Sequence, residues 1–316
     1  MMLGLAAGLV AANTMPAQAA TLDVCPSGCP YATIQQALAA AASGDTVSVA
    51  PGTYPGGFTI GKHVTVVGSG AGQTTVRGTG RVGVGITVAA GVRAIIEALT
   101  VDAAGTPAKT GDSVYNDGTL TLRYAAITGA NNNWALANFG GTLTVDYTSV
   151  SGNNAPGIFN SHGAVPTVGT VTIYHSTMAG NGGPVSGGIE NGDIMTIGQS
   201  TITGNGGERA GGIDNSGALT IWGSTIDGNN GGGISNGVSG TTGPASTLTL
   251  RGVTIQNNSG GPVGGIWNGI NGVARLDHTR VVRNIGLSFG GIYNQGRLIL
   301  SDSVVRHNIP NDCVGC

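Results

Sequence analysis

The sequence predicts an all-β protein: a solenoid in which short strands stack into three parallel sheets, preceded by one short helix. Glycine accounts for 59 of 316 residues and aromatic residues for only 4%, so the side chains suit a thin core repeated along an axis. A degenerate repeat, GGIxN followed by LTIxxSTIxxN, recurs from residue 112 to residue 310. Within each unit, three short runs alternate apolar and polar residues between Gly or Asn turns, which is the pattern of half-buried strands.

The first 20 residues have the pattern of an export signal. Residues 3–12 are apolar, and Ala17-Gln18-Ala19 offers the small-x-small site that a signal peptidase cleaves. We therefore expect residues 1–20 to be a signal peptide and the protein to be secreted and extracellular. The absence of Lys or Arg before the apolar run leaves open a start upstream of Met1, and a buried N-terminal helix is the alternative. No later run reaches the ~18 apolar residues of a membrane span, so no membrane insertion is expected.

Residues 21–316 are expected to form one β-solenoid domain. Its parts in order are a capping helix at 31–43, the first coils at 44–111, the GGIxN repeats at 112–310 and a Cys-containing cap at 311–316. The helix is predicted by the spacing of its apolar residues, Ile34, Ala37, Leu38 and Ala41. A cap is expected because an open solenoid end exposes apolar stacks and strand edges.

The four cysteines lie in two local pairs, Cys25 with Cys29 and Cys313 with Cys316. Export favours disulfides, and each pair is expected to close its own short loop. One zinc site built from both pairs is an alternative only if the chain ends meet in space. A redox-active or reduced CxxC pair is the other alternative.

Two series of asparagines mark the repeats, with steps of 21–32 residues in the first series. The first series closes GGIxN, at Asn116, Asn138, Asn160, Asn191, Asn215, Asn236, Asn268 and Asn294. The second ends the next block, at Asn153, Asn181, Asn205, Asn229, Asn258, Asn284 and Asn308. We expect their amides to form ladders at the corners of stacked coils, where glycine supplies positive φ and close approach. An antiparallel sandwich, the alternative, would need hairpins and no such period.

This repeat unit resembles those of the right-handed parallel β-helix in the pectin-lyase-like superfamily, including secreted bacterial relatives of polymorphic outer-membrane proteins. The segments Tyr31–Ala42 and Gly44–Tyr54 resemble that fold's capping helix and first strand. The resemblance implies that the GGIxN strands form the sheet that carries the substrate groove in polysaccharide-acting members. It also implies Lys or Arg as the base of a lyase, often with calcium.

The x position of GGIxN should point outward, because the neighbouring Ile points into the core. Down the stack it is occupied by Tyr115, Ala137, Phe159, Glu190, Asp214, Ser235, Trp267 and Tyr293. Tyr115, Phe159, Trp267 and Tyr293 are predicted to bind sugar rings through their aromatic faces, although aromatics also merely shield exposed sheets. The glycine before each Ile is expected to leave a shallow channel. The column contains no Lys or Arg that could serve as the base of a lyase, so a lyase mechanism is disfavoured.

Glu190 and Asp214 occupy this column in consecutive coils, ~4.8 Å apart by the inter-strand spacing. One pKa should therefore be raised, or the pair should bind a cation. The two are candidate catalytic residues of a retaining glycosidase, and with Asp193 they are candidate calcium ligands. Arg209 is a candidate clamp for an acidic sugar. The alternative is that these acids are ordinary solvated surface residues.

Two insertions after the groove strand, at residues 161–170 and 237–247, are expected to wall the groove. The first contains His162, a candidate substrate contact whose alternative is an inert loop histidine. Tyr174-His175 and Asp277-His278 are expected to be solvated turn residues away from the groove.

The sequence therefore predicts a monomeric secreted protein that binds an extended polysaccharide, with calcium as a possible cofactor. A polysaccharide hydrolase, less favourably a lyase, is the first alternative, and a structural or adhesin-like surface protein is the second. Lys and Arg total 13 against 15 Asp and Glu, so no basic field favours nucleic-acid binding.

Overall fold

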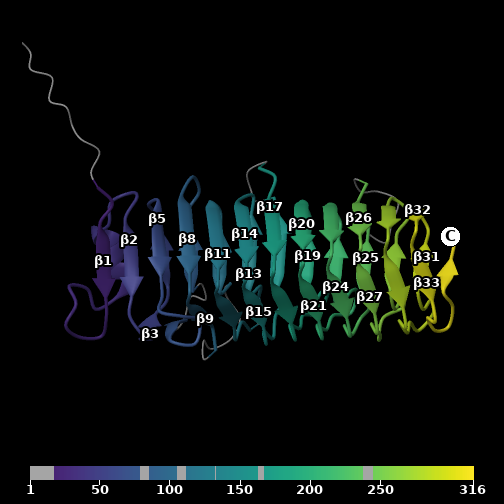
Figure 1. The fold of residues 1–316 in the computed structure, drawn as a ribbon, viewed down its shortest axis with the longest axis horizontal. Helices are drawn as coiled ribbons and strands as arrows, with labels where there is room; N and C mark the ends of the chain where they lie inside the picture. Colours follow the sequence, from purple (N-terminus) through teal and green to yellow (C-terminus); the bar gives the residue numbers. More distant parts are fainter. Residues whose placement is uncertain (1–17, 79–84, 105–111, 132, 163–166, 238–244) are drawn as a thin grey trace, which may run out of the picture.

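A computed structural model describes residues 18–78, 85–104, 112–131, 133–162, 167–237 and 245–316. The chain forms a straight rod in which the described N-terminal residues and Cys316 lie at opposite ends (Figure 1). Three parallel sheets run along the rod, so the expected three-sheet parallel β-helix is confirmed, with the right-handed crossover that parallel strands adopt. Most of the predicted signal peptide, residues 1–17, lies outside the described residues.

Each coil contributes one strand to each sheet, and within the described residues the sheets hold 12, 11 and 11 strands. Sheet A contains β1 (Thr21–Val24), β2 (Thr46–Val49), β5 (Val64–Val67), β8 (Arg93–Glu97), β11 (Thr119–Arg123), β14 (Thr142–Asp146), β17 (Thr170–Tyr174), β20 (Ile194–Gly198), β23 (Ala218–Trp222), β26 (Thr247–Arg251), β29 (Val273–Asp277) and β32 (Arg297–Ser301).

Sheet B follows sheet A within each coil. It contains β3 (Gly52–Pro55), β6 (Thr74–Arg77), β9 (Thr100–Asp102), β12 (Ala126–Thr128), β15 (Ser149–Ser151), β18 (Thr177–Ala179), β21 (Thr201–Thr203), β24 (Thr225–Asp227), β27 (Thr254–Gln256), β30 (Arg280–Val282) and β33 (Val304–Arg306).

Sheet C carries the GGIxN strands. It contains β4 (Phe58–Ile60), β7 (Ile86–Val88), β10 (Val114–Asn116), β13 (Leu136–Phe139), β16 (Ile158–Ser161), β19 (Ile189–Asn191), β22 (Ile213–Asn215), β25 (Ile234–Asn236), β28 (Ile266–Asn268), β31 (Ile292–Asn294) and β34 (Cys313–Val314).

The core is a single column of aliphatic side chains inside the coils. Equivalent residues pair in register, as in Ile189 with Ile213 and Ile213 with Ile234, and these three side chains are at most 3% exposed. In β23 the pattern alternates as predicted, with Leu219 and Ile221 buried and Thr220 turned outward. Scarce aromatics are sufficient because each coil needs only a few branched aliphatic residues to fill its cross-section.

Both asparagine series form the predicted ladders. In the first series each Asn Nδ2 except that of the last member, Asn294, donates to the Oδ1 of its equivalent one coil on, at 2.7–2.9 Å. The second series does the same at 2.7–3.0 Å. A buried amide without partners would be costly, so these ladders fix the register of one coil on the next.

The helix α1 (Ile34–Ala40) begins at Thr33, whose side chain accepts from Gln36 N while the Gln36 side chain accepts from the Thr33 backbone. This capping box supports a helix of only seven residues. Ile34, Ala37 and Leu38 are buried against the first coils, so the predicted cap is present, although shorter than residues 31–43. No helix in the described part of the chain is long and apolar enough to cross a bilayer.

Cys25 is bonded to Cys29 and Cys313 to Cys316. Each disulfide lies within its own end of the rod, as predicted, and the two ends do not meet (Figure 1). A shared zinc site is therefore excluded by the distance between the ends, and no cysteine is free in this structure.

Candidate functional site

The outward column of sheet C is the candidate site. Register pairs Tyr115 with Ala137, Ala137 with Phe159 and Phe159 with Glu190. It then pairs Asp214 with both Glu190 and Ser235, followed by Trp267 and Tyr293. Aromatic residues thus lie at both ends of the column and the two acids lie between them.

Aromatic rings cluster at the N-terminal end of the column. Phe139 packs between Tyr115 and Phe159, with ring centroids 5.2 and 5.1 Å away. Trp134 stacks on Phe159 at 4.1 Å. Ala137, which is fully buried, leaves room beneath these rings because its own side chain is small. The result is a continuous aromatic surface over three coils.

Glu190 lies directly beyond this cluster. Its Oε2 accepts a hydrogen bond from Ser186 Oγ at 3.2 Å. Burial and then the charge of Asp214 raise the pKa of Glu190, against smaller opposing effects that include the Arg209 charge and hydrogen bonding from Trp134. A carboxyl group held in this way keeps its proton to higher pH than an exposed glutamate.

Asp214 has different partners. It is only 6% exposed, and burial raises its pKa, while Arg209 opposes that shift by its charge and by a hydrogen bond from Nη1 to Oδ2 at 3.0 Å. The predicted neighbours Glu190, Asp214 and Arg209 therefore do come together. They are not plain solvated residues, since the guanidinium is the counter-charge of a buried carboxylate.

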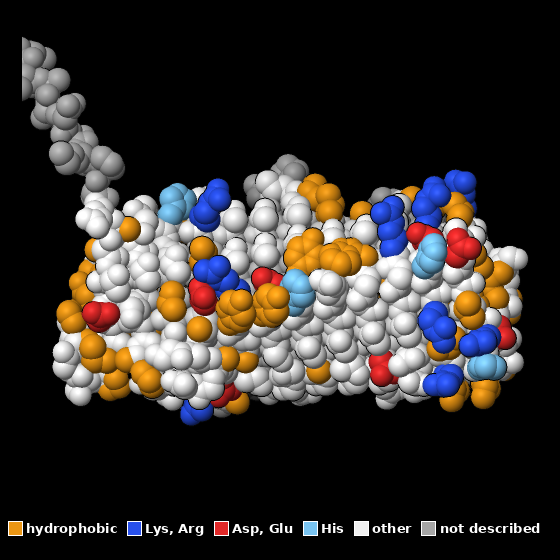
Figure 2. All heavy atoms as spheres, viewed as in Figure 1, with side chains coloured by type: hydrophobic (Ala, Val, Ile, Leu, Met, Phe, Trp, Pro, Cys, Tyr) orange, Lys and Arg blue, Asp and Glu red, His pale blue; other side chains and the backbone are white. Residues whose placement is uncertain are grey.

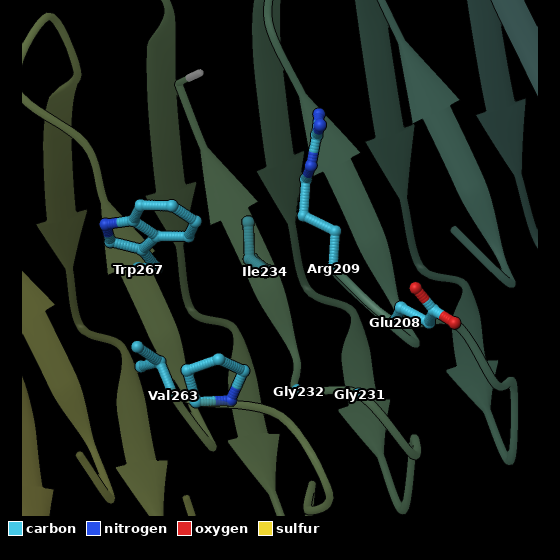
Figure 3. Close-up of a pocket in the computed structure, with 8 residues that line it drawn as sticks. Glu208, Arg209, Gly231, Gly232, Ile234, Val263 and Trp267 are labelled. Carbon is cyan, nitrogen blue, oxygen red and sulfur yellow. The ribbon is translucent and has the colours of Figure 1, made fainter. Parts of the chain in front are cut away.

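A pocket of about 220 Å³ adjoins Arg209 on the side of Trp267. Figure 3 shows Arg209 and Trp267 on either side of Ile234, with Val263, Gly231 and Gly232 along one edge. Trp267 Nε1 donates to Gln295 Oε1 at 3.2 Å, which holds the indole. Beyond it Tyr293 stacks on Phe289 at 3.9 Å with parallel rings.

Asp193 and His162 lie elsewhere. Asp193 Oδ2 accepts from Gly169 N at 2.8 Å, and its Oδ1 is 3.2 Å from His162 Nδ1, so the carboxylate joins two loops. The three predicted calcium ligands do not lie together. Among the described residues, the cluster of three possible metal ligands whose ligand atoms lie within 4.8 Å of one another is a different one, Asp277, His278 and Asp302. The expected calcium set of Glu190, Asp193 and Asp214 is thus not assembled, because Asp193 follows its strand at the opposite edge of sheet C from Arg209.

The glycine before each Ile does not line a channel, contrary to expectation. A Cβ on Gly212 would overlap the carbonyl oxygen of Gly233 and lie 3.1 Å from Ile226 Cγ2. Gly188, Gly233, Gly265 and Gly291 have equivalent surroundings. These positions point into the stack, where only glycine lets two coils approach.

The wall of the site comes from the segments that join sheet B to sheet C. Arg209 was singled out from the sequence, but Trp134, Phe139, Ser186 and Phe289 were missed. A signal existed for Phe139, which replaces the small or polar residue that follows Asn in the other copies. The insertions expected to wall the groove include residues 163–166 and 238–244, which lie outside the described residues.

The sequence matches no family model and no curated protein sequence. Among solved structures it is similar to the A-module of Azotobacter vinelandii mannuronan C-5 epimerase AlgE4 (14% identity, TM-score 0.41, 87% of this chain and 94% of that chain). It is also similar to the AlgE6 A-module of the same organism (16%, 0.39, 86% and 93%) and to pectate lyase Pel9A (13%, 0.39, 95% and 73%). At these identities and structural overlaps none of the three assigns an activity to this chain.

Proposed function

We propose that the outward column of sheet C binds an extended polysaccharide lying along the rod axis. The observation that supports this is the arrangement of half-buried aromatic rings at both ends of an acid pair, half-buried Glu190 and buried Asp214, with the Arg209 pocket between the acids and Trp267. Flat rings pack on the apolar faces of sugars, and acids with an arginine supply directional hydrogen bonds to hydroxyls.

Secretion is part of the same proposal. Two closed disulfides favour an oxidising compartment outside the cytoplasm, where extracellular glycans are found. A nucleic-acid partner is not part of this proposal, because the formal charge of the whole chain is −2.

A polysaccharide array tests the proposal, with retention measured for the wild type, Trp267→Ala and Thr201→Ala. On the polymer that the wild type retains, Trp267→Ala should weaken binding about fivefold or more, since an aromatic face is lost. Thr201→Ala, on the outer face of sheet B, should leave retention unchanged. If Trp267→Ala retains every polymer as the wild type does, the groove proposal fails and the adhesin-like alternative becomes the better explanation.

Hydrolysis of the bound polysaccharide is the second candidate function. It is favoured by the unequal surroundings of the acids: burial raises both pKa values, Asp214 raises that of Glu190 further, and the hydrogen-bonded Arg209 opposes the shift at Asp214. In a retaining glycosidase one carboxyl group is protonated and its neighbour is ionised; here Glu190 would protonate the leaving oxygen and Asp214 would attack the anomeric carbon. Release of reducing ends from the retained polymer distinguishes cleavage from binding alone.

A further inference from the structure

A second line of aromatic side chains runs along the rod, away from sheet C. It occupies the edge of sheet A where each strand turns into sheet B. Register aligns Asp146 with Tyr174, Tyr174 with Gly198, Gly198 with Trp222 and Trp222 with Arg251. We call the following residues the corner strip: Tyr124, Tyr147, Tyr174, His175, Trp222 and Arg251.

Three rings of the corner strip stack on one another. Tyr124 and Tyr147 lie 5.2 Å apart at 15°, and Tyr147 and His175 lie 4.5 Å apart at 12°. Each follows the end of its strand with positive φ, between 45° and 52°, so the turn repeats from coil to coil. Asp146 Oδ1 and Gln199 Oε1 hold the His175 ring at 3.1 and 2.8 Å. His175 thus lies at an exposed turn away from sheet C, as expected, with half-buried Tyr174 beside it.

These rings are open to solvent. Tyr124 and Tyr147 are 52% and 49% exposed. Figure 2 shows hydrophobic side chains and a histidine gathered over the middle of this face, with Lys and Arg side chains concentrated toward the C-terminal end.

Trp222 lies flat on the sheet beside this row. A Cβ on Gly198 would overlap the indole ring, so the ring covers Gly198 and presents its other face outward. Tyr174 flanks the same spot, with its ring centroid 5.9 Å from that of Trp222 and tilted by 53°. Because Gly198 has no side chain, Trp222 and Tyr174 form a shallow aromatic surface over it, which we call the aromatic tray.

Toward the C-terminal end of this face the three arginines Arg251, Arg275 and Arg297 outnumber the two acids Asp277 and Asp302, of which Asp277 is the register partner of Arg251. Glu97 is paired with Arg123 at 2.7 Å, Asp146 with His175, and Asp277 with His278 at 2.7 Å. Arg251, next to Trp222, forms no ion pair or side-chain hydrogen bond within the described residues, and the same holds for Arg275 and Arg297 on the outer face of sheet A. A ligand with negative charges would be complementary to this end of the strip.

We propose that the corner strip binds a linear polysaccharide carrying carboxylate or sulfate groups, at a site separate from sheet C. Sugar rings would pack on Tyr174 and Trp222, and an acidic group would accept hydrogen bonds from the Arg251 guanidinium. From Tyr124 to Arg251 the strip spans six strands of sheet A, about 24 Å at the inter-strand spacing. A surface this long and only one or two side chains wide fits a polymer strand better than a globular protein, whose interfaces are broad.

Affinity electrophoresis of the full chain in carboxymethyl cellulose and in uncharged hydroxyethyl cellulose tests the proposal. All variants carry Trp267→Ala, so that binding by the groove on sheet C is weakened equally in each of them. The parent variant should be retarded by carboxymethyl cellulose at low salt and less so at high salt. Trp222→Ala should weaken this retention about fivefold or more. Arg251→Gln should weaken it and flatten its salt dependence, whereas Arg280→Gln on sheet B should change neither.

Gly198→Thr is a sharper variant, because it keeps every ligand-contacting residue. The threonine side chain would displace the indole from the tray while favouring the strand conformation, so the melting temperature should hold and retention should fall. The proposal is overturned by unchanged retention in Trp222→Ala and Gly198→Thr, by equal mobility of the parent in the two polymers, or by an equal effect of Arg280→Gln and Arg251→Gln. Binding to phosphatidylglycerol vesicles without retention by the polymer would overturn it in favour of a lipid surface.

Discussion

Asp112 illustrates how a single buried side chain ties stability to pH. It is 4% exposed, and its Oδ1 accepts from Asn133 Nδ2 at 2.7 Å and from Trp134 N at 3.3 Å. Burial raises its pKa from 3.8 to about 6, and these two hydrogen bonds only partly oppose the shift. The residue thereby holds the backbone of Trp134, whose indole stacks in the aromatic cluster of the site.

Replacing Asp112 by Asn should stabilise the protein at neutral pH. A raised carboxyl pKa contributes stability that is complete below the unfolded value of 3.8 and is lost as the pH rises through about 6. Asn keeps the accepting oxygen without the charge, so its advantage should grow over that window to at most ~3 kcal/mol. Melting temperatures of both proteins from pH 4 to pH 8 check this, and parallel curves would contradict it.

At Glu190 and Asp214 the prediction concerns chemistry. If the groove hydrolyses its ligand, Glu190→Gln and Asp214→Asn should each abolish the release of reducing ends while retention on the polymer persists. Cleavage by the wild type should decline as the pH rises through the pKa of Glu190, because the proton donor is lost, and that pKa is raised by burial and by Asp214. Ordinary surface acids would leave retention and cleavage the same in both variants.

At the scale of the element, neighbouring coils approach closely at glycine positions where a side-chain methyl group would have no room. Gly212→Ala should cost ~1–3 kcal/mol or more, because its Cβ would overlap the Gly233 carbonyl in the backbone of the next coil. Gly206→Ala, in the same coil, is the matched control: its Cβ would meet only the Asn230 carbonyl oxygen, at 4.0 Å. Urea unfolding should place Gly206→Ala within ~0.5 kcal/mol of the wild type. Equal losses would show that the overlap with the Gly233 carbonyl does not decide the cost.

The strands and corners could be predicted from the sequence because every repeat carries the same pattern of apolar residues, glycines and asparagines. Ile213 and Asn215 have equivalents in almost every coil, and this repetition fixes the inward face and the ladder. The same repetition aligns Glu190 with Asp214. Trp134 and Phe289 could not be assigned in this way, since each occurs once and reaches the column from a segment that joins sheet B to sheet C. Phe139 lies in β13 itself and departs from the small or polar residues that follow Asn in the other copies. The direction of Gly212 was misjudged because strand alternation does not continue through the bend that precedes β22.

At the scale of the whole molecule, the rod has one axis along which each coil contacts only its neighbours. Stability should then be a sum of nearest-neighbour terms, with less protection at the ends than in the middle. The structure shows the same gradient in burial: Ile213, in the middle, is fully buried, whereas Leu300 in the last sheet A strand is 43% exposed although it pairs with buried Leu276.

Hydrogen exchange should reveal this gradient and its response to a core mutation. In the wild type, amides of β19, β22 and β25 should be the slowest to exchange and those of β32 and β33 among the fastest, since the latter strands are paired on one side only within the described residues. Ile213→Ala removes a buried side chain between two stacked equivalents and should lower the protection of β19, β22 and β25 by ~2–5 kcal/mol. Leu300→Ala, the matched control, should cost much less and only near β29 and β32, because its side chain is already partly in water. Equal protection along the wild-type rod, or an equal loss in every coil of Ile213→Ala, would mean that the solenoid opens as one unit. In that case the two binding surfaces proposed on sheets A and C would share a single stability, and a defect beneath one would weaken the other.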